Sequence, residues 1–363
     1  MPASGPSRIV VLAPNWLGDL VMALPAIASL RAWKPEAHLA VAARSGIAPV
    51  LQLVAGVDEV VPLDASGGFR SAITASADAR RLADGRFDAA LLLPNSFAAA
   101  LVARRAGIAE RWGFRRDFRG RLLTRAIDPP KASMHHAEYY LALVAALGAP
   151  ALPPVASLRV DQALRDRATA LLNDAGWRGE PIVAFAPGAA FGTAKRWPPD
   201  RVGVVAASLA RERGAVPVLV GAAADAATAQ YVHDVYTSAT RAGSVPPMID
   251  LTGRTDLPTL AAVLALSTTV VANDSGAMHV AAAVGAPVVA LFGPTNERRT
   301  SPLADRAGAP RAIVAGNAWC RPCELRRCPL DHRCMKSISV ERVAAEATRL
   351  MHDGRGRVSG AQS

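Results

Sequence analysis

Short apolar runs rich in β-branched residues alternate with longer segments of helical periodicity along the chain. The runs with the length and composition of buried strands are 8–13, 38–42, 59–63, 89–93, 181–186, 216–221, 268–271 and 287–292. Helical spacing separates them, most clearly at 20–33, 135–147 and 161–175. Because parallel strands need crossover connections that are usually helical, this alternation predicts an α/β fold with parallel sheets.

A proline-rich passage at 149–157 divides the pattern into two halves of similar architecture. At 363 residues, the chain is long enough for two domains of ordinary size. We therefore predict two Rossmann-like, doubly wound α/β domains, 1–158 and 159–363, that face each other across a cleft. The second domain would also carry a cysteine cluster and a C-terminal helix.

Composition narrows the choice of partner without deciding it. The formal net charge of +11 and the pI of about 10.3 indicate an acidic partner such as nucleic acid, a phosphorylated substrate or an anionic membrane surface. No apolar run approaches the ~20 residues of a membrane-spanning helix, and the run after Arg8 is too short for the core of a signal peptide. We therefore expect a cytoplasmic protein.

The positive charge is concentrated in a basic strip at 104–125. This strip contains eight arginines, with Trp112, Phe114 and Phe118 between them. Basic and aromatic side chains together suit single-stranded nucleic acid and a lipid headgroup zone equally well. A solvated surface without a ligand is the third interpretation of the same residues.

The strongest local signal for a ligand site is the stretch 268–285. An apolar strand stops at Asn273-Asp274-Ser275-Gly276, and an alanine-rich helix begins at once. The free N–H groups and the positive dipole end of such a helix can hold a phosphate. Ser275 and His279 lie one helical turn apart and could contact the same anion. Alternatively, Ser275 or Asp274 only caps the helix, and His279 only packs.

Two further strand ends carry small polar residues. Asp19 stands where the first strand meets the first helix, and Asn95-Ser96 follow the fourth strand. The carboxyl ends of parallel strands are where open α/β sheets bind ligands. A helix-capping role for Asp19 is the simpler alternative.

The loop 187–198 bears glycines and Lys195 but matches neither common phosphate motif. It has no Gly-x-Gly-x-x-Gly, and Lys195 does not directly follow a glycine as in a Walker loop. No two aspartates stand two residues apart, so the Asp-x-Asp pair that holds a divalent metal in many transferases is absent. A diphosphate leaving group would then be stabilised by protein groups, namely Lys195, His279 and the helix start at Ser275-Gly276. A solvated Lys195-Arg196 pair is the alternative.

Four cysteines lie close together near the end of the chain, at Cys320, Cys323, Cys328 and Cys334. The first spacing, Cys-x2-Cys, is typical of zinc sites, whereas the second pair is loosely spaced. A structural zinc site and free or redox-labile thiols are both compatible with this pattern. A cytoplasmic location disfavours structural disulfides.

Taken in order, several of these motifs resemble the ADP-heptose:lipopolysaccharide heptosyltransferases of glycosyltransferase family 9, most closely those of type II. The resembling stretches are 16–25 (WLGDLVMALP), 93–97 (LPNSF), 187–198 (PGAAFGTAKRWP), 273–283 (NDSGAMHVAAA) and 291–295 (LFGPT). The resemblance implies a GT-B fold and an inverting transfer of heptose from ADP-heptose that needs no metal or other cofactor.

The resemblance also implies roles for individual residues. Asp19 would be the general base, and Lys195, Ser275, Gly276 and His279 would hold the diphosphate. Asp274 would bind sugar hydroxyls, Thr193 would contact the donor, and Thr255 would lie near the adenine. The place of an acidic ribose-binding residue is taken by Ala222, Ala223 and Ala224, and only Asp225 follows.

On the acceptor side, the resemblance implies a lipid A-Kdo-heptose acceptor and a peripheral location on the inner face of the inner membrane. Asn95, Ser96, Arg115 and Arg116 would bind this phosphorylated acceptor, and nucleic acid would not be a partner. About 1 kcal/mol per basic residue near an anionic leaflet would suffice for docking. A related transferase with another nucleotide sugar or acceptor, of type I or III, is the closest alternative, and a nucleic-acid-binding protein is the more distant one.

Overall fold

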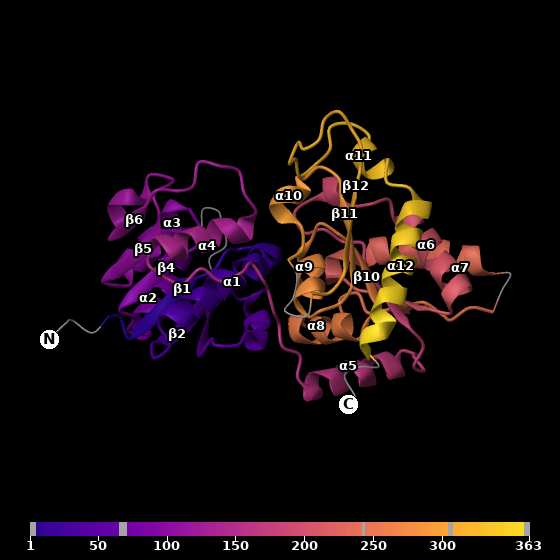
Figure 1. Ribbon diagram of the computed structural model, residues 1–363, viewed down its shortest axis with the longest axis horizontal. Helices are drawn as coiled ribbons and strands as arrows, with labels where there is room; N and C mark the ends of the chain where they lie inside the picture. The colour runs from indigo at the N-terminus through magenta and orange to yellow at the C-terminus, as the bar shows by residue number, and fades with distance from the viewer. Residues whose placement is uncertain (1–4, 65–70, 242–243, 304–307, 359–363) are drawn as a thin grey trace. The chain divides into compact units, whose positions relative to one another are not determined.

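The computed structural model describes residues 5–64, 71–241, 244–303 and 308–358. The chain divides into two compact units, Met1–Val155 and Ala156–Ser363, a few residues before the expected boundary. Each unit contains one parallel six-stranded sheet (Figure 1).

The first sheet has the strand order β3-β2-β1-β4-β5-β6. Its strands are β1 (Arg8–Leu12), β2 (His38–Arg44), β3 (Glu59–Leu63), β4 (Ala89–Leu92), β5 (Glu110–Phe114) and β6 (Arg125–Ile127). The helices of this unit are α1 (Leu17–Trp33), α2 (Ser71–Asp84), α3 (Phe97–Arg105) and α4 (His136–Ala146), with short 3-10 turns η1 (Ala48–Leu53) and η2 (Arg119–Leu122). Helix α1 packs against α4, and α2 packs against α3.

The second sheet has the strand order β12-β11-β10-β7-β8-β9. Its strands are β7 (Ile182–Ala186), β8 (Val216–Leu219), β9 (Ile249–Asp250), β10 (Thr269–Asn273), β11 (Val288–Phe292) and β12 (Arg311–Ala315). The helices are α5 (Gln162–Asp174), α6 (Pro199–Arg213), α7 (Ala226–Thr240), α8 (Leu257–Leu266), α9 (Gly276–Ala283), α10 (Glu297–Thr300), α11 (Arg333–Lys336) and α12 (Val340–Val358), with turns η3 (Thr193–Lys195) and η4 (Ala223–Asp225).

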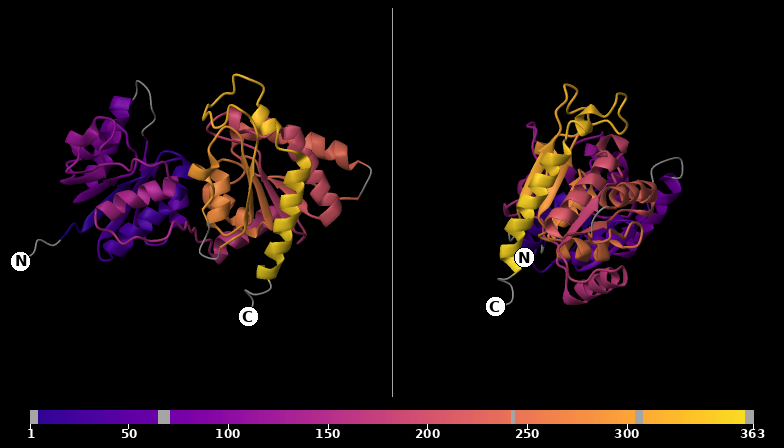
Figure 2. Two further views of the ribbon diagram at one scale, coloured as in Figure 1. Left: turned by 45° about the horizontal axis from the view of Figure 1, so that its top comes forward. Right: turned by 90° about the vertical axis from the view of Figure 1, so that its right-hand side faces the viewer.

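Helices cover the second sheet in two groups. Helices α6, α7 and α12 share one apolar core with alternate strand residues such as Val271 and Val289. Helix α9 packs on β10 and β11 and also on α8, which in turn packs on α5 (Figure 2). Because side chains alternate along a strand, Val271 packs against the helices on one face of the sheet, while Val270 and Ala272 face the opposite side.

Both sheets have the same doubly wound topology, which confirms the predicted fold class. Strand order reverses between β1 and β4 in the first unit and between β7 and β10 in the second. At such a switch point, neighbouring loops leave in opposite directions and open a crevice at the carboxyl ends of the strands. The two switch points are therefore the places to look for a site.

The basic strip at 104–125 is partly structural, because two of its three aromatic side chains and Arg119 are buried while most of its arginines are exposed. It contains β5 and the first residue of β6, two strands that the sequence pattern did not predict because arginines interrupt their apolar positions. Trp112 and Phe114 are buried, whereas Phe118 is 100% exposed. The strip therefore cannot present all of its aromatic side chains to a nucleic acid or a membrane. Strands β9 and β12 were missed as well.

Arg119 is the most deeply buried cation of this strip, at 0% exposure. Its guanidinium donates to the carbonyl oxygen of Phe114 at 2.9 Å and to Asn95 Oδ1 at 3.2 Å. Burial lowers the pKa of Arg119 to about 10. Arg119 therefore organises the loops that follow β4 and β5.

We expect Arg119→Met to destabilise the protein by about 3 kcal/mol or more, because several buried carbonyl and amide oxygens would lose their donor. Urea unfolding will measure this change. Arg116→Met is the matched control in the same loop, where the side chain is exposed, and should stay within about 0.5 kcal/mol of the parent protein. Equal stability of the two variants would contradict the assigned role of Arg119.

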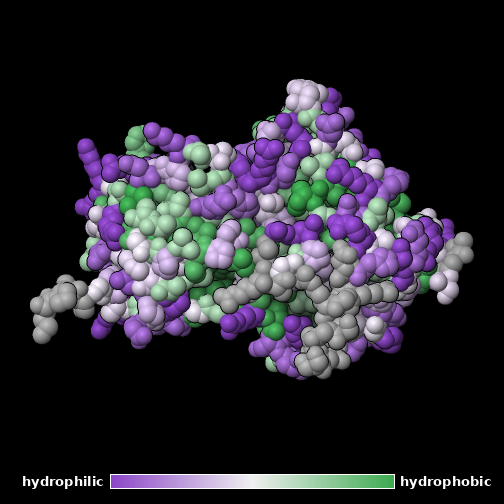
Figure 3. All heavy atoms as spheres, in the orientation of Figure 1, coloured by the Kyte–Doolittle hydropathy of each residue, from purple (hydrophilic) through white to green (hydrophobic). Residues whose placement is uncertain are grey.

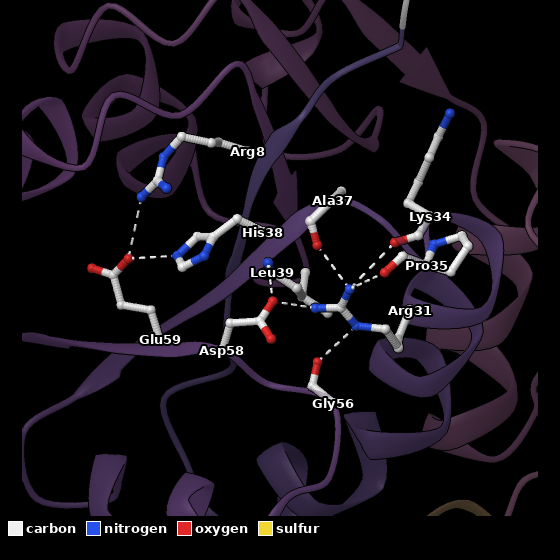
Figure 4. A network of polar contacts seen from close by, with 10 residues as sticks. All are labelled: Arg8, Arg31, Lys34, Pro35, Ala37, His38, Leu39, Gly56, Asp58 and Glu59. Atoms are coloured by element: carbon white, nitrogen blue, oxygen red, sulfur yellow. Dashed lines mark hydrogen bonds and ion pairs between the residues drawn. The ribbon is translucent and has the colours of Figure 1, made fainter.

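A polar network fixes α1 at its C-terminal end (Figure 4). The Arg31 guanidinium donates to the carbonyl oxygens of Pro35 and Gly56, both at 2.9 Å, and pairs with Asp58. The backbone amide of Leu39 and the Arg31 side chain hold the pKa of Asp58 below its usual value. This network anchors the helix whose other end carries Asp19.

The surface of the protein is mixed in character. On the face shown in Figure 3, hydrophilic side chains interrupt the apolar areas. None of the helices in the described ranges combines the length and the apolar character that a bilayer span requires.

Candidate functional site

Asp19 lies at the switch point of the first unit, in the first turn of α1 directly after β1. The helix begins at Leu17, earlier than predicted, and its N-cap residue is Trp16. Asp19 is therefore not the cap. Its Oδ1 lies 3.2 Å from Nδ1 of His136, the first residue of α4, and both side chains are partly exposed. Sequence analysis missed His136, because a partner 117 residues away leaves no local signal.

The Asp19 carboxylate also influences Tyr140, one turn further along α4. Burial raises the pKa of Tyr140 well above its ordinary value, and the negative charge of Asp19 adds to the rise. Tyr140 therefore stays protonated around neutral pH. The site around Asp19 thus contains a carboxylate held by an imidazole, with a neutral phenol nearby.

The other side of this switch point is formed by the loop after β4. Ser96 caps α3 by accepting a hydrogen bond from the Ala99 amide at 3.3 Å. Asn95 donates to the hydroxyl of Tyr139 at 2.9 Å and accepts from Arg119. Asn95 is thus held rigidly at the carboxyl edge of the sheet.

Arg115 and Arg116 follow β5, the next strand along the same edge. Both side chains are exposed, and Nε of Arg115 lies 3.4 Å from Oδ1 of Asp128. The four residues predicted to bind the acceptor therefore lie after neighbouring strands of one sheet.

The switch point of the second unit contains a nearly buried ion pair. Lys195, in η3 after β7, places Nζ 2.7 Å from Oδ2 of Asp274, which follows β10. Thr295 donates its hydroxyl to the same oxygen at 2.7 Å. Asp274 is only 4% exposed, and the Lys195 side chain 13%. Lys195 and Asp274 were both predicted as site residues, whereas their pairing and the part of Thr295 were not.

Asn273, the last residue of β10, fixes the geometry of the lysine loop. Its side-chain oxygen accepts from the Trp197 amide at 3.1 Å, and its side-chain nitrogen donates to the Pro187 carbonyl at 2.8 Å. Both ends of the loop are therefore fastened to β10. A polar residue at the end of a buried strand was the only signal for this role in the sequence.

Helix α9 begins at Gly276 with Ser275 as its N-cap residue. The Ser275 side chain does not cap the helix, and its buried hydroxyl oxygen has no hydrogen-bond partner within the described ranges. His279 lies one turn later and is 3% exposed. A helix start whose N-cap hydroxyl is unused fits an anion site better than a purely structural cap.

Asp225 lies beside Gly188 and Gly221, which follow β7 and β8. An added Cβ at Gly188 would lie 2.3 Å from Asp225 Oδ2, so a larger residue there would displace the Asp225 carboxylate. Arg196 pairs with Asp225 at 3.2 Å. Asp225, the acidic residue that follows the three alanines, is thus at the carboxyl edge of the second sheet. Thr193 and Thr255 lie on loops of the same edge, after β7 and β9.

The four cysteines are free thiols on the segment that joins β12 to α12. Burial raises the pKa of the Cys334 thiol, and charge on the other three cysteines adds to this rise. Among the described residues, no three histidine, cysteine or acidic side chains are placed to hold a metal ion. The zinc-site interpretation therefore receives no support from the structure.

Comparison with known proteins decides the family. Residues 76–333 match glycosyltransferase family 9 (heptosyltransferase). The chain belongs to this family. It is 33% identical over 314 residues to lipopolysaccharide heptosyltransferase 2 of Salmonella typhimurium, covering 85% of this chain and 88% of that protein. It is 31% identical over 318 residues to lipooligosaccharide heptosyltransferase 2 of Haemophilus influenzae, covering 84% and 89%.

The solved structure of E. coli ADP-heptose LPS heptosyltransferase II resembles this family 9 glycosyltransferase in fold. The TM-score is 0.76 at 28% identity, with 96% of this chain and 99% of the E. coli chain covered. The family 9 glycosyltransferase of Veillonella parvula gives a TM-score of 0.78 at 22% identity, with 96% and 97% covered, which supports the fold alone. The chain is therefore a glycosyltransferase with the two-unit fold of the heptosyltransferases.

Proposed function

We propose that this glycosyltransferase moves heptose from ADP-heptose to the lipid A-Kdo-heptose inner core of lipopolysaccharide, with inversion and without a metal ion. The relatives named heptosyltransferase 2 support heptose transfer to lipopolysaccharide, and the name of the solved E. coli heptosyltransferase II supports ADP-heptose as the donor. The observation that carries the chemistry is the placement of polar side chains at both switch points: a carboxylate in one unit, and a cation with a helix start in the other.

On the donor side, Lys195 and the start of α9 bind the diphosphate. Asp274 and Thr295 orient Lys195, and the ammonium keeps donors for phosphate oxygens. The backbone N–H groups after Ser275 and the unused Ser275 hydroxyl add fixed dipoles, with His279 one turn away. Such preorganised groups stabilise the negative charge that develops on a departing ADP. Thr193 and Thr255 contact the remainder of the donor.

On the acceptor side, Asp19 is the general base. The acceptor hydroxyl oxygen attacks the anomeric carbon, the bond from that carbon to the diphosphate oxygen breaks, and its electron pair leaves with ADP. The hydroxyl proton passes to Asp19. His136 holds one carboxylate oxygen, which fixes the direction of the other. Asn95, Ser96, Arg115 and Arg116 bind the phosphorylated acceptor.

We further propose a cytoplasmic enzyme that docks on the inner face of the inner membrane. Phe118 is fully exposed between Arg116 and Arg121, in a loop of the first unit. An exposed ring among arginines fits the headgroup zone of an anionic leaflet, where each basic residue contributes about 1 kcal/mol.

The test is turnover with ADP-heptose and a heptosylated lipid A-Kdo acceptor in the presence of EDTA. Release of ADP together with a heptose-extended product is expected, and ADP should inhibit more strongly than UDP. No product under these conditions would contradict the proposal. Turnover with another acceptor, or stronger inhibition by UDP, would instead identify a related transferase of different specificity.

A further inference from the structure

The cysteine-bearing segment 316–334 follows β12 at the carboxyl edge of the second sheet and ends in the first residues of α11 (Figure 1). The Lys195, Asp274 and Thr295 network lies on three loops, and the segment contacts two of them, the loop that carries Lys195 and the loop that carries Thr295. The mechanism above assigns no role to this segment.

The first contact is made by Arg326 to the lysine loop. The Arg326 carbonyl accepts a hydrogen bond from the Ala194 amide at 3.1 Å. An added Cβ at Gly192 would lie 2.2 Å from the same carbonyl oxygen, so the two backbones could not approach this closely with any other residue at 192. Arg326 is thus held against the residues that lead into Lys195.

The second contact is to the loop after β11. Arg321 donates to the carbonyl oxygens of Gly293 at 2.5 Å and Thr295 at 3.1 Å, and it pairs with Glu297 at 2.6 Å. The Glu324 amide donates to the Pro294 carbonyl at 2.9 Å. The segment is therefore fastened on both sides of the Lys195 network, and the Arg321 side chain is engaged in that fastening.

The Arg326 side chain lies over the ring of Phe191, with its guanidinium carbon 5.1 Å from the ring centroid. The Lys195 ammonium lies 4.7 Å from the same centroid. Together these distances limit the separation of the two cations to about 9.8 Å. Because both cations lie over the same ring, Arg326 adds positive charge to the surroundings of the Lys195–Asp274 pair, and added positive potential favours a multivalent anion.

We propose that Arg326 is a second cation of the donor site and binds the diphosphate of the nucleotide sugar together with Lys195. This inference rests on the proposed function, because it takes a nucleoside diphosphate sugar as the ligand. It also gives the cysteine-bearing segment a role: the segment positions Arg326 beside the lysine loop.

The test is the affinity for ADP of the parent protein, Arg326→Ala and Arg326→Gln, measured by calorimetry. Both variants should bind ADP about 10- to 100-fold more weakly, since a charge-assisted contact to phosphate is lost. The backbone contacts of residue 326 remain in either variant, and Gln keeps most of the length of the side chain. The loss for AMP should be smaller than that for ADP.

Arg327→Ala is the matched control, because it removes the same charge from the adjacent residue, and it should bind ADP within about twofold of the parent. Parent-like ADP affinity in both Arg326 variants would overturn the inference and leave the proposed function standing. Equal weakening by Arg327→Ala would also overturn it, by revealing a general charge effect. If the parent protein itself binds no ADP, that result contradicts the proposed function, on which this inference rests.

Discussion

Asp19→Asn will lower kcat by about 10²- to 10⁴-fold, the usual contribution of a positioned general base. Asparagine keeps the shape of the side chain and an oxygen that can accept from His136, but it cannot take the proton of the acceptor hydroxyl. In this account ADP is bound by residues of the second unit, so its affinity should stay within about twofold of the parent. Rates at saturating ADP-heptose and acceptor, together with ADP calorimetry, measure both quantities.

The control for this variant is Asp117→Asn in the same unit. Asp117 is exposed and has a positive φ of 49°, a backbone conformation that asparagine also tolerates. Its kcat should match that of the parent protein. If Asp19→Asn retained half of the parent rate, Asp19 would not be the base, and the first switch point would have another role.

Lys195→Met will impair both stability and turnover. The substitution leaves the Asp274 carboxylate buried without its cation, which typically costs about 3 to 5 kcal/mol. Loss of a preorganised cation at the leaving group should lower kcat by about 10²- to 10³-fold. Urea unfolding and steady-state kinetics will measure the two effects.

The double variant Lys195→Met/Asp274→Asn separates these effects. It removes both charges, so it should regain most of the lost stability while turnover stays low. Arg167→Met, which breaks an exposed pair with Asp256, should change stability by less than about 1 kcal/mol. Recovery of turnover in the double variant would show that Lys195 only neutralises Asp274 and does not bind the donor.

The sequence could predict residues whose role follows from a local transition between elements. Asp19, Asn95 and Ser275 each follow a short apolar strand and stand at or near the start of a helix, and parallel topology then places them at the ligand-binding edge of a sheet. The same reasoning predicted the two doubly wound units.

The remaining features of the site could not be predicted, because they arise from contacts between residues that are far apart in the sequence. Lys195 and Asp274 are 79 residues apart in the sequence, and His136 and Asp19 are 117 residues apart. Neither pair can therefore be predicted from the periodicity or spacing of residues. Strands β5 and β6 were missed for a different reason. Their arginines resembled a ligand surface, while Arg119 in the loop between them satisfies buried backbone carbonyls.

The most direct measurement is a crystal structure of the protein with ADP bound. We predict diphosphate oxygens within hydrogen-bond distance of Lys195 Nζ and of the backbone N–H groups at the start of α9. A diphosphate bound away from both Lys195 and Ser275 would contradict it.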